Sequence, residues 1–214
     1  MEINAAAIWI NETFAAFDLA VSTAVHKLYN LGGGFFTPFF EFVSDLAYHG
    51  IFLIILSVLL MLFKKSRRFG AAMLLGLGVG LLLTNCVLKV LIARPRPFSD
   101  QSSPYYQMWV LVGQNIETDK SFPSGHVTAA FAASTAIYLV GDKRISWTAF
   151  IFGLLMAVAR IYLCVHFPSD VLGGMIAGII AGILGTVIAY YLPRKYYEFD
   201  IWKPRGGGKH ARVQ

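Results

Sequence analysis

Five long apolar runs constrain this chain more than any other feature. They occupy residues 50–63, 70–93, 126–141, 145–163 and 171–192, with short charged clusters between them. An apolar run of roughly 20 residues crosses a bilayer as a helix. Only 14% of the residues are charged, whereas soluble domains carry about 25%. The sequence therefore predicts an all-α protein with a single domain, a polytopic membrane helical bundle.

The N-terminal stretch 8–30 is a weaker apolar run because polar residues such as Asp18 interrupt it. We expect it to be the first of about six transmembrane helices, with an interfacial helix as the alternative. The phenylalanine-rich segment 32–47 predicts a short helix near the interface or an extension of a neighbouring span. Within the single domain we expect three parts, namely residues 1–49, the core 50–192 and a basic tail 193–214.

Three clusters of basic residues predict the orientation in the membrane. They are Lys64, Lys65, Arg67 and Arg68; then Lys143 and Arg144; then Arg194, Lys195, Lys203, Arg205, Lys209 and Arg212. Lysine and arginine collect on the cytoplasmic side of membrane proteins. With six spans, all three clusters and both termini are then cytoplasmic, and segments 31–49, 94–125 and 164–170 face outside. We expect the plasma membrane as the location.

Composition also argues against several other classes of protein. The net charge of +6 is explained as an orientation signal, so no nucleic-acid partner is expected. Cys86 and Cys164 lie in or beside apolar runs and offer neither a disulfide framework nor metal-ligand spacing, so we expect them to be packing residues. The first residues lack the pattern of a cleavable signal peptide.

Ionisable residues gather at the predicted outer face, where cations are disfavoured. These residues are Lys89, Arg94, Arg96, His126, Arg160, His166 and Asp170. Such a set suits phosphoryl transfer, because lysine and arginine can neutralise the transferring phosphoryl group without a metal. One histidine can attack phosphorus while the other protonates the leaving oxygen. Asp170, four residues after His166, can fix the tautomer of its ring.

The stretch Pro123-Ser124-Gly125-His126 begins one of the apolar runs. Free backbone N–H groups and the helix dipole make a helix start an anion site. Gly125 allows close approach of the backbone, and Ser124 adds a hydroxyl donor. The sequence therefore predicts a phosphate site here.

Each of these residues also has a purely structural explanation. Asp170 and Ser124 are equally consistent with helix N-caps. Lys89 and Arg160 are consistent with side chains that extend from helix ends to the interface. The two histidines are consistent with structural polar residues. A catalytic role is favoured because these residues all lie on one predicted face of the membrane, and because their spacings form a particular combination.

Those spacings resemble the signature motifs of the type 2 phosphatidic acid phosphatase superfamily. The motifs here are Lys89 separated by six residues from Arg96-Pro97; Pro123-Ser124-Gly125-His126; and Arg160 with His166 and Asp170. The resemblance covers roughly residues 50–192. Ala159 stands where the family usually has serine, which predicts a weaker phosphate contact with activity retained. The motif spacing selects Arg96 and leaves Arg94 as a secondary candidate.

The resemblance implies a role for each matching residue. His166 would be the nucleophile that forms a phosphohistidine, oriented by Asp170, and His126 would be the general acid. The implied phosphate ligands are Lys89, Arg96, Ser124, Gly125 and Arg160. Members of the family do not require a metal, so no metal and no cofactor are expected.

The resemblance also implies a lipid substrate. The chain is similar to small bacterial lipid phosphatases, which favours phosphatidylglycerophosphate and, closely behind it, undecaprenyl diphosphate. Phosphatidic acid and diacylglycerol diphosphate are alternatives.

The aromatic loop 98–122 is expected either to cover the site or only to anchor at the interface. A lipid-phosphate binder or transporter on the same frame is the rival hypothesis, although His126 and His166 are both present. Vanadium-dependent haloperoxidases share the motifs on soluble proteins, and the membrane spans argue against them. The sequence leaves the oligomeric state open.

Overall fold

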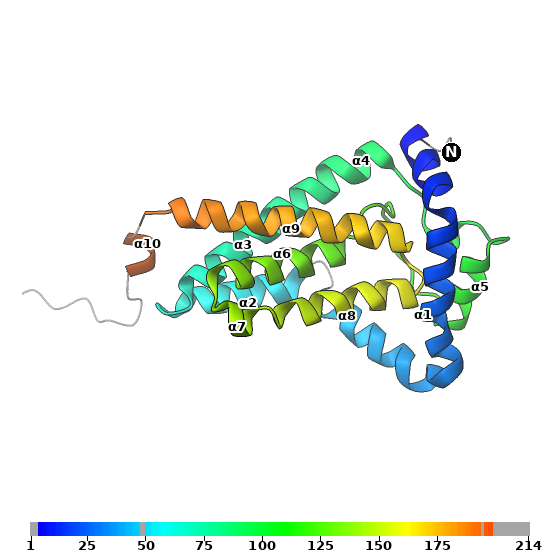
Figure 1. The fold of residues 1–214 in the computed structure, drawn as a ribbon, viewed down its shortest axis with the longest axis horizontal. Helices are drawn as coiled ribbons and strands as arrows, with labels where there is room; N and C mark the ends of the chain where they lie inside the picture. Colours follow the sequence, from blue (N-terminus) through cyan, green and yellow to red (C-terminus); the bar gives the residue numbers. More distant parts are fainter. Residues whose placement is uncertain (1–3, 48–49, 194, 199–214) are drawn as a thin grey trace, which may run out of the picture.

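The computed structural model describes residues 4–47, 50–193 and 195–198, and every regular element in this part of the chain is a helix. Several helical segments run roughly along the long axis of the molecule, and helix α1 (Ala5–Asp45) crosses one end of them (Figure 1). The lengthwise segments are α2 (Ile51–Leu62), the continuous α3, η2 and α4 (Arg67–Leu81, Leu82–Leu88 and Lys89–Ile92), α6 (Gly125–Val140), α8 (Ala149–Tyr162) and α9 (Pro168–Tyr191). The predicted all-α bundle is confirmed.

Three segments in the described part of the chain are long and apolar enough to cross a bilayer. They are Arg67–Ser99, Lys143–Tyr162 and Pro168–Tyr191. Helices α2 and α6 are also apolar but have only 12 and 16 residues. Helix α1 has the length but does not have the composition of a span. Six spans are therefore not confirmed.

The centre of the bundle is held by close packing of α9 against α6 and α3. A Cβ atom at Gly178 would lie 2.6 Å from the carbonyl oxygen of Thr128 in α6. A Cβ atom at Gly185 would lie 2.2 Å from the backbone nitrogen of Gly76 in α3. Only glycine permits these approaches, which are typical of helix pairs in membranes. The pairing fixes the position of the α9 N-terminus relative to that of α6.

Helix α1 contains both of the N-terminal predictions. Its backbone departs from helical geometry at Gly32, where φ is 176° and ψ is 57°. The half before this kink covers stretch 8–30, and it lies across the end of the bundle (Figure 1), which favours the interfacial-helix alternative. The half after the kink covers segment 32–47. There Phe40 is buried against Tyr162 of α8, with 4.8 Å between ring centroids.

The two ends of the bundle differ in charge and in connections. The α2–α3 turn and α7 (Lys143–Ser146) carry the first two basic clusters, and both lie at the end away from α1 (Figure 1). The third cluster is described only at Lys195, because Arg194 and residues 199–214 lie outside the described residues. The N-terminal end of α1 and helix α10 (Lys195–Glu198) lie at opposite ends of the molecule. The side of the membrane on which each terminus lies stays a prediction.

Candidate active site

A cavity of about 950 Å³ lies at the α1 end of the bundle. Its lining includes many of the residues that the sequence singled out, namely Lys89, Arg96, Gly125, His126, Arg160 and His166. They come from α4, α6, α8 and the loops that follow α4 and α8. The same cavity continues along apolar side chains of α2 and α3, which are Ile54, Leu74, Leu77 and Leu81. The structure thus brings residues from three separate motifs to one partly polar, partly apolar space.

The π-helical segment η2 precedes the first of these residues. It spans Leu82–Leu88, and Lys89 follows it directly. Within it, the hydroxyl of buried Thr84 donates to that of Thr128 in α6 at 3.3 Å, and Asn85 lines the cavity. π-Helical turns are rare and are frequently found at functional sites. The widened turn is therefore part of the cavity wall.

His166 lies in the loop between α8 and α9 and is only 2% exposed. A guanidinium nitrogen of Arg96 lies 2.9 Å from its Nε2 atom. Because arginine can only donate, Nε2 must accept this hydrogen bond, and the ring proton resides on Nδ1. Burial lowers the pKa of His166 well below its ordinary value, and the nearby charges of Arg96 and Arg160 lower it further. The ring is therefore neutral at neutral pH.

Asp170 lies behind this ring, in the first turn of α9, and is fully buried. Its Oδ2 atom is 3.7 Å from Nδ1 of His166, within range of an ion pair but beyond a hydrogen bond. The same oxygen accepts from the hydroxyl of Ser121 at 2.6 Å and from the backbone N–H of Phe167 at 2.9 Å. The bond from Phe167 is the capping bond of α9, so the capping explanation applies to Asp170, and its role in orienting His166 stays a prediction.

Three of the cations that line the cavity, Lys89, Arg96 and Arg160, are paired with carboxylates of one loop. Asp119 forms ion pairs with Lys89 and Arg96, and Glu117 forms one with Arg160. A second carboxylate contact joins Glu117 to Arg96 at 3.8 Å. Burial alone would raise the pKa of Asp119, but Lys89 and Arg96 outweigh burial, and the pKa lies below its ordinary value. Asp119 is therefore an anion beside Lys89 and Arg96.

Arg160 has one further feature that points to an anion site. Its side chain is 3% exposed, and its Nε atom finds no hydrogen-bond partner among the described residues. The same guanidinium donates to Ser44 of α1. The preceding Ala159, where the family usually has serine, is fully buried and is not part of the cavity lining.

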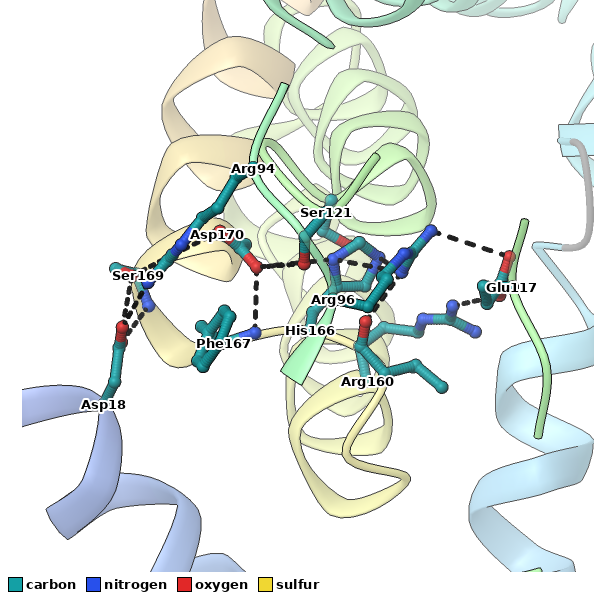
Figure 2. A network of polar contacts seen from close by, with 12 residues as sticks. Asp18, Arg94, Arg96, Glu117, Ser121, Arg160, His166, Phe167, Ser169 and Asp170 are labelled. Atoms are coloured by element: carbon teal, nitrogen blue, oxygen red, sulfur yellow. Dashed lines mark hydrogen bonds and ion pairs between the residues drawn. The ribbon is translucent and has the colours of Figure 1, made fainter. Parts of the chain in front are cut away.

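Three of the predicted site residues do not line the cavity, namely Asp170, Ser124 and the secondary candidate Arg94. Ser124 is fully buried, its hydroxyl has no partner among the described residues, and its backbone N–H donates to the carbonyl oxygen of Asp170 at 3.1 Å. Its side chain makes no capping bond. Arg94, the secondary phosphate candidate, is 1% exposed and bonds Asp18 and Asp170 on the far side of His166 (Figure 2). In this structure it is a partner of carboxylates.

Sequence reasoning missed Glu117, Asp119, Asp18 and Ser121. A usable signal existed for the first two, because Glu117 and Asp119 are carboxylates on a predicted outer face that is rich in cations. Both expected roles of loop 98–122, covering the site or anchoring at the interface, stay predictions. Trp109 is buried and stacks on Phe98 with 4.7 Å between ring centroids, while the end of the loop reaches the cavity.

Within the described residues, no group of three or more histidine, cysteine or acidic side chains is arranged to hold a metal ion. Cys86 is exposed, Cys164 is buried, and both are free thiols.

Comparison with known proteins gives matches over most of the bundle. The sequence model of the PAP2 superfamily matches residues 69–194. The chain is 33% identical over 142 residues to undecaprenyl-diphosphatase BcrC of Bacillus subtilis (strain 168), a match that covers 63% of this chain and 65% of the relative. It is 34% identical over 128 residues to phosphatidylglycerophosphatase B of the same organism, with 55% and 57% covered. The chain thus spans less than two thirds of the length of these relatives.

A solved structure is similar over a larger part of the chain. It is the crystal structure of a transmembrane PAP2 type phosphatidylglycerolphosphate phosphatase from Bacillus subtilis. The TM-score is 0.67 at 25% sequence identity, and the match covers 88% of this chain and 92% of that one.

Proposed function

Because this chain belongs to the PAP2 superfamily, we propose that it is an integral membrane phosphatase that hydrolyses a lipid phosphate or diphosphate. One observation carries the proposal. Lys89, Arg96 and Arg160 converge beside a buried, neutral His166 in a cavity that continues along apolar side chains. A phosphate needs the cations, and a lipid chain needs the apolar lining. The unit that does this is a single membrane-embedded domain.

The first chemical step is transfer of the phosphoryl group to His166. The substrate phosphate replaces Glu117 and Asp119 beside the three cations, and Gly125 leaves room at the start of α6. The Nε2 lone pair of His166 forms the N–P bond as the P–O bond to the lipid breaks. His126, as general acid, gives its proton to the departing lipid oxygen. Buried Ser124 supports the α6 start from behind through its bond to Asp170.

The second step returns the histidine to its starting state. A water molecule loses a proton to His126 and attacks phosphorus, and the N–P bond breaks to release inorganic phosphate. In the intermediate the imidazole ring carries positive charge, and the Asp170 carboxylate beside Nδ1 stabilises that charge. No step requires a metal or a cofactor.

Phosphatidylglycerophosphate and undecaprenyl diphosphate are the proposed substrates. Relatives that carry these activities in their names match the chain at 34% and 33% identity. In phosphatidylglycerophosphate the reaction breaks a phosphomonoester, and in undecaprenyl diphosphate it breaks the phosphoanhydride. The partner surface is the lipid bilayer, and no nucleic acid is involved.

We place the cavity at the outer face of the plasma membrane. The α2–α3 turn and α7, which carry basic residues, lie at the opposite end, and basic residues mark the cytoplasmic side. Helix α1, which crosses the cavity end of the bundle, then lies at the outer interface. Labelling of intact cells with an impermeant maleimide tests this. Glu12→Cys should react and Lys65→Cys should not, each in a Cys86→Ser background. The reverse pattern would overturn the orientation.

Phosphate release by the purified protein in detergent, with EDTA present, tests the activity. Phosphatidylglycerophosphate, undecaprenyl diphosphate and phosphatidic acid are compared as substrates. We expect turnover of at least one lipid, loss of turnover in His166→Ala, and little change in His26→Ala, a control at a buried histidine outside the cavity. No release of phosphate by folded wild-type protein would favour a lipid-phosphate binder, and a strict need for added Mg²⁺ would contradict the mechanism.

A further inference from the structure

One buried and extensively hydrogen-bonded arginine in this region is not used by the mechanism above. Arg94 is fully buried, and its Nε donates to Asn11 at 2.7 Å. One terminal nitrogen donates to Asp170 at 2.6 Å and to Ser169 at 2.7 Å. The other donates to Asp18 at 2.9 Å, and the guanidinium lies 4.0 Å from the ring centroid of Phe167. Every nitrogen of the guanidinium is therefore engaged.

We propose that Arg94 and Asp18 form a positioning pair that holds Asp170 and tunes the charge behind His166. The inference rests on the proposed function of the cavity. Neither residue lines that cavity, so neither can touch the substrate phosphate. Both act through Asp170, which is the only one of the three close to the histidine ring.

The geometry at Asp170 explains the positioning. Arg94 donates a hydrogen bond to Oδ1 of Asp170, and the other oxygen, Oδ2, lies on the side of His166. A carboxylate held through one oxygen cannot rotate about its terminal bond without breaking that bond. Partners behind a functional histidine–carboxylate pair fix its orientation in this way. Without Arg94, the Ser121 and Phe167 bonds alone would hold the carboxylate.

The charge of the group explains the tuning. Arg94 is a single cation between two carboxylates, so Asp18, Arg94 and Asp170 together carry one net negative charge in a buried environment. Phosphorylation of His166 makes its ring positive, and this negative charge stabilises it. Without the Asp18 charge, Arg94 and Asp170 would form a neutral pair, and His166 would face less negative potential.

The Asp18–Arg94–Asp170 group also joins helix α1 to the start of α9, next to His166. Asp18 belongs to α1, and it accepts from the backbone N–H and the hydroxyl of Ser169 in α9, both at 2.7 Å. Figure 2 shows the chain of contacts from Asp18 through Arg94 to Asp170 on one side of His166. Helix α1 is thereby tied to the residue that orients the nucleophile.

Steady-state kinetics of Asp18→Asn in the full-length protein test the pair. We expect kcat to fall by about 10- to 100-fold with KM within about twofold, as for partners that act through another residue. The acid limb of kcat/KM, which reports the free enzyme, should move to lower pH. The sign follows because removal of a negative charge makes protonation of His166 harder.

Three further variants separate a positioning role from plain loss of structure. Glu12→Gln removes the same charge from an exposed site on α1 and should match wild type. Asp18→Glu keeps the charge and should keep the acid limb in place even where kcat falls. Asn11→Ala removes a neutral acceptor of Arg94 and should lower kcat without moving the limb.

The outcomes distinguish this inference from the function on which it rests. Wild-type protein without turnover on any lipid would overturn both. An active wild type with Asp18→Asn equal to Glu12→Gln would overturn the positioning pair alone. A shift of the acid limb in Asp18→Glu or Asn11→Ala as large as in Asp18→Asn would also overturn it. If Asp18→Asn does not fold, Asp18→Glu and Asn11→Ala decide the question. A lower kcat with the acid limb in place supports the pair, and a wild-type kcat in both or a shifted limb in either overturns it.

Discussion

The carboxylates on the two sides of His166 differ in burial and in partners. On one side, the side chains of Asp18 and Asp170 are 2% and 0% exposed, and Arg94 binds both. On the other side, those of Glu117 and Asp119 are 23% and 49% exposed and meet cations that line the cavity. Figure 2 shows Asp18 and Glu117 at the two extremes of this polar network.

The difference indicates which carboxylates can leave their partners. A buried carboxylate that loses its partner has no water to replace it, so the Arg94 side is fixed. A half-exposed carboxylate on a loop can be rehydrated when a substrate phosphate takes its place. Similar ion pairs are therefore structural on one side of the histidine and exchangeable on the other.

The largest expected effect is on the fixed side. Asp170→Asn should lower kcat by about a thousandfold to ten-thousandfold, as when the carboxylate behind the catalytic histidine of serine proteases is replaced, and KM should change little. Steady-state kinetics on the preferred lipid measure both constants. Asp100→Asn, at an exposed carboxylate that bonds only Ser102, is the matched control. An unchanged kcat in Asp170→Asn would leave only its capping role.

A second test on that side concerns stability. Arg94→Met leaves two buried carboxylates without their cation, which should cost about 3–5 kcal/mol of folding free energy. Thermal melting in detergent measures the loss. The double variant with Asp18→Asn should recover part of it, because only one unpaired carboxylate remains. A melting temperature of Arg94→Met equal to that of wild type would show that the ion pairs on the Arg94 side are no more structural than those on the cavity side.

A smaller effect of opposite sign is expected on the exchangeable side. Asp119→Asn removes the carboxylate paired with Lys89 and Arg96 and leaves Arg96 only its longer contact with Glu117. Inorganic phosphate should therefore inhibit about two- to fivefold more strongly, the range of a partly exposed ion pair. Inhibition constants measured at fixed ionic strength test this, with Asp100→Asn again as the control. Weaker inhibition in the Asp119 variant would show that the carboxylate helps to build the phosphate site.

The smallest effect is a shift in pH dependence. Because burial and nearby cations lower the pKa of His166, its protonated form should appear only at pH values well below about 6.5. The acid limb of kcat/KM should therefore lie below that value, since a protonated ring cannot attack phosphorus. Glu117→Gln removes a partner of Arg160, leaves more positive charge near the ring and should move the limb further down. An acid limb of kcat/KM near pH 6.5, the ordinary pKa of histidine, would mean that the His166 ring is more hydrated than the structure shows.

Sequence patterns predicted the site best where local geometry decides position. His166 and Asp170 are four residues apart, and the structure places them together at the start of α9. The helix-end cations Lys89 and Arg160 also line the predicted site, because a helix end at the outer face determines where its last side chains lie. These predictions needed only helix periodicity and the location of the apolar runs.

Contacts between distant parts of the chain were beyond such patterns. Asp18 and Arg94 are 76 residues apart, and nothing in either local sequence indicates that they meet. Helix α1 was ambiguous because its buried face carries Asp18, Ser22 and His26, while apolar residues such as Trp9 and Phe17 are exposed. These polar residues lower the mean hydropathy of α1, so its sequence looks like that of a weak transmembrane span. The roles of Glu117 and Asp119 depend on a loop path that spacing does not determine.

The π-helical segment η2 has a consequence for how the chain tolerates changes in length. A π-helical turn holds more residues than an α-helical one, and each residue of an α-helix rotates the chain by about 100°. Deleting one residue within Leu82–Leu88 would allow regular α-helix to form and would turn Lys89 away from the cavity, although no site residue had been changed. The number of residues in the segment thus sets the direction in which Lys89 leaves the helix.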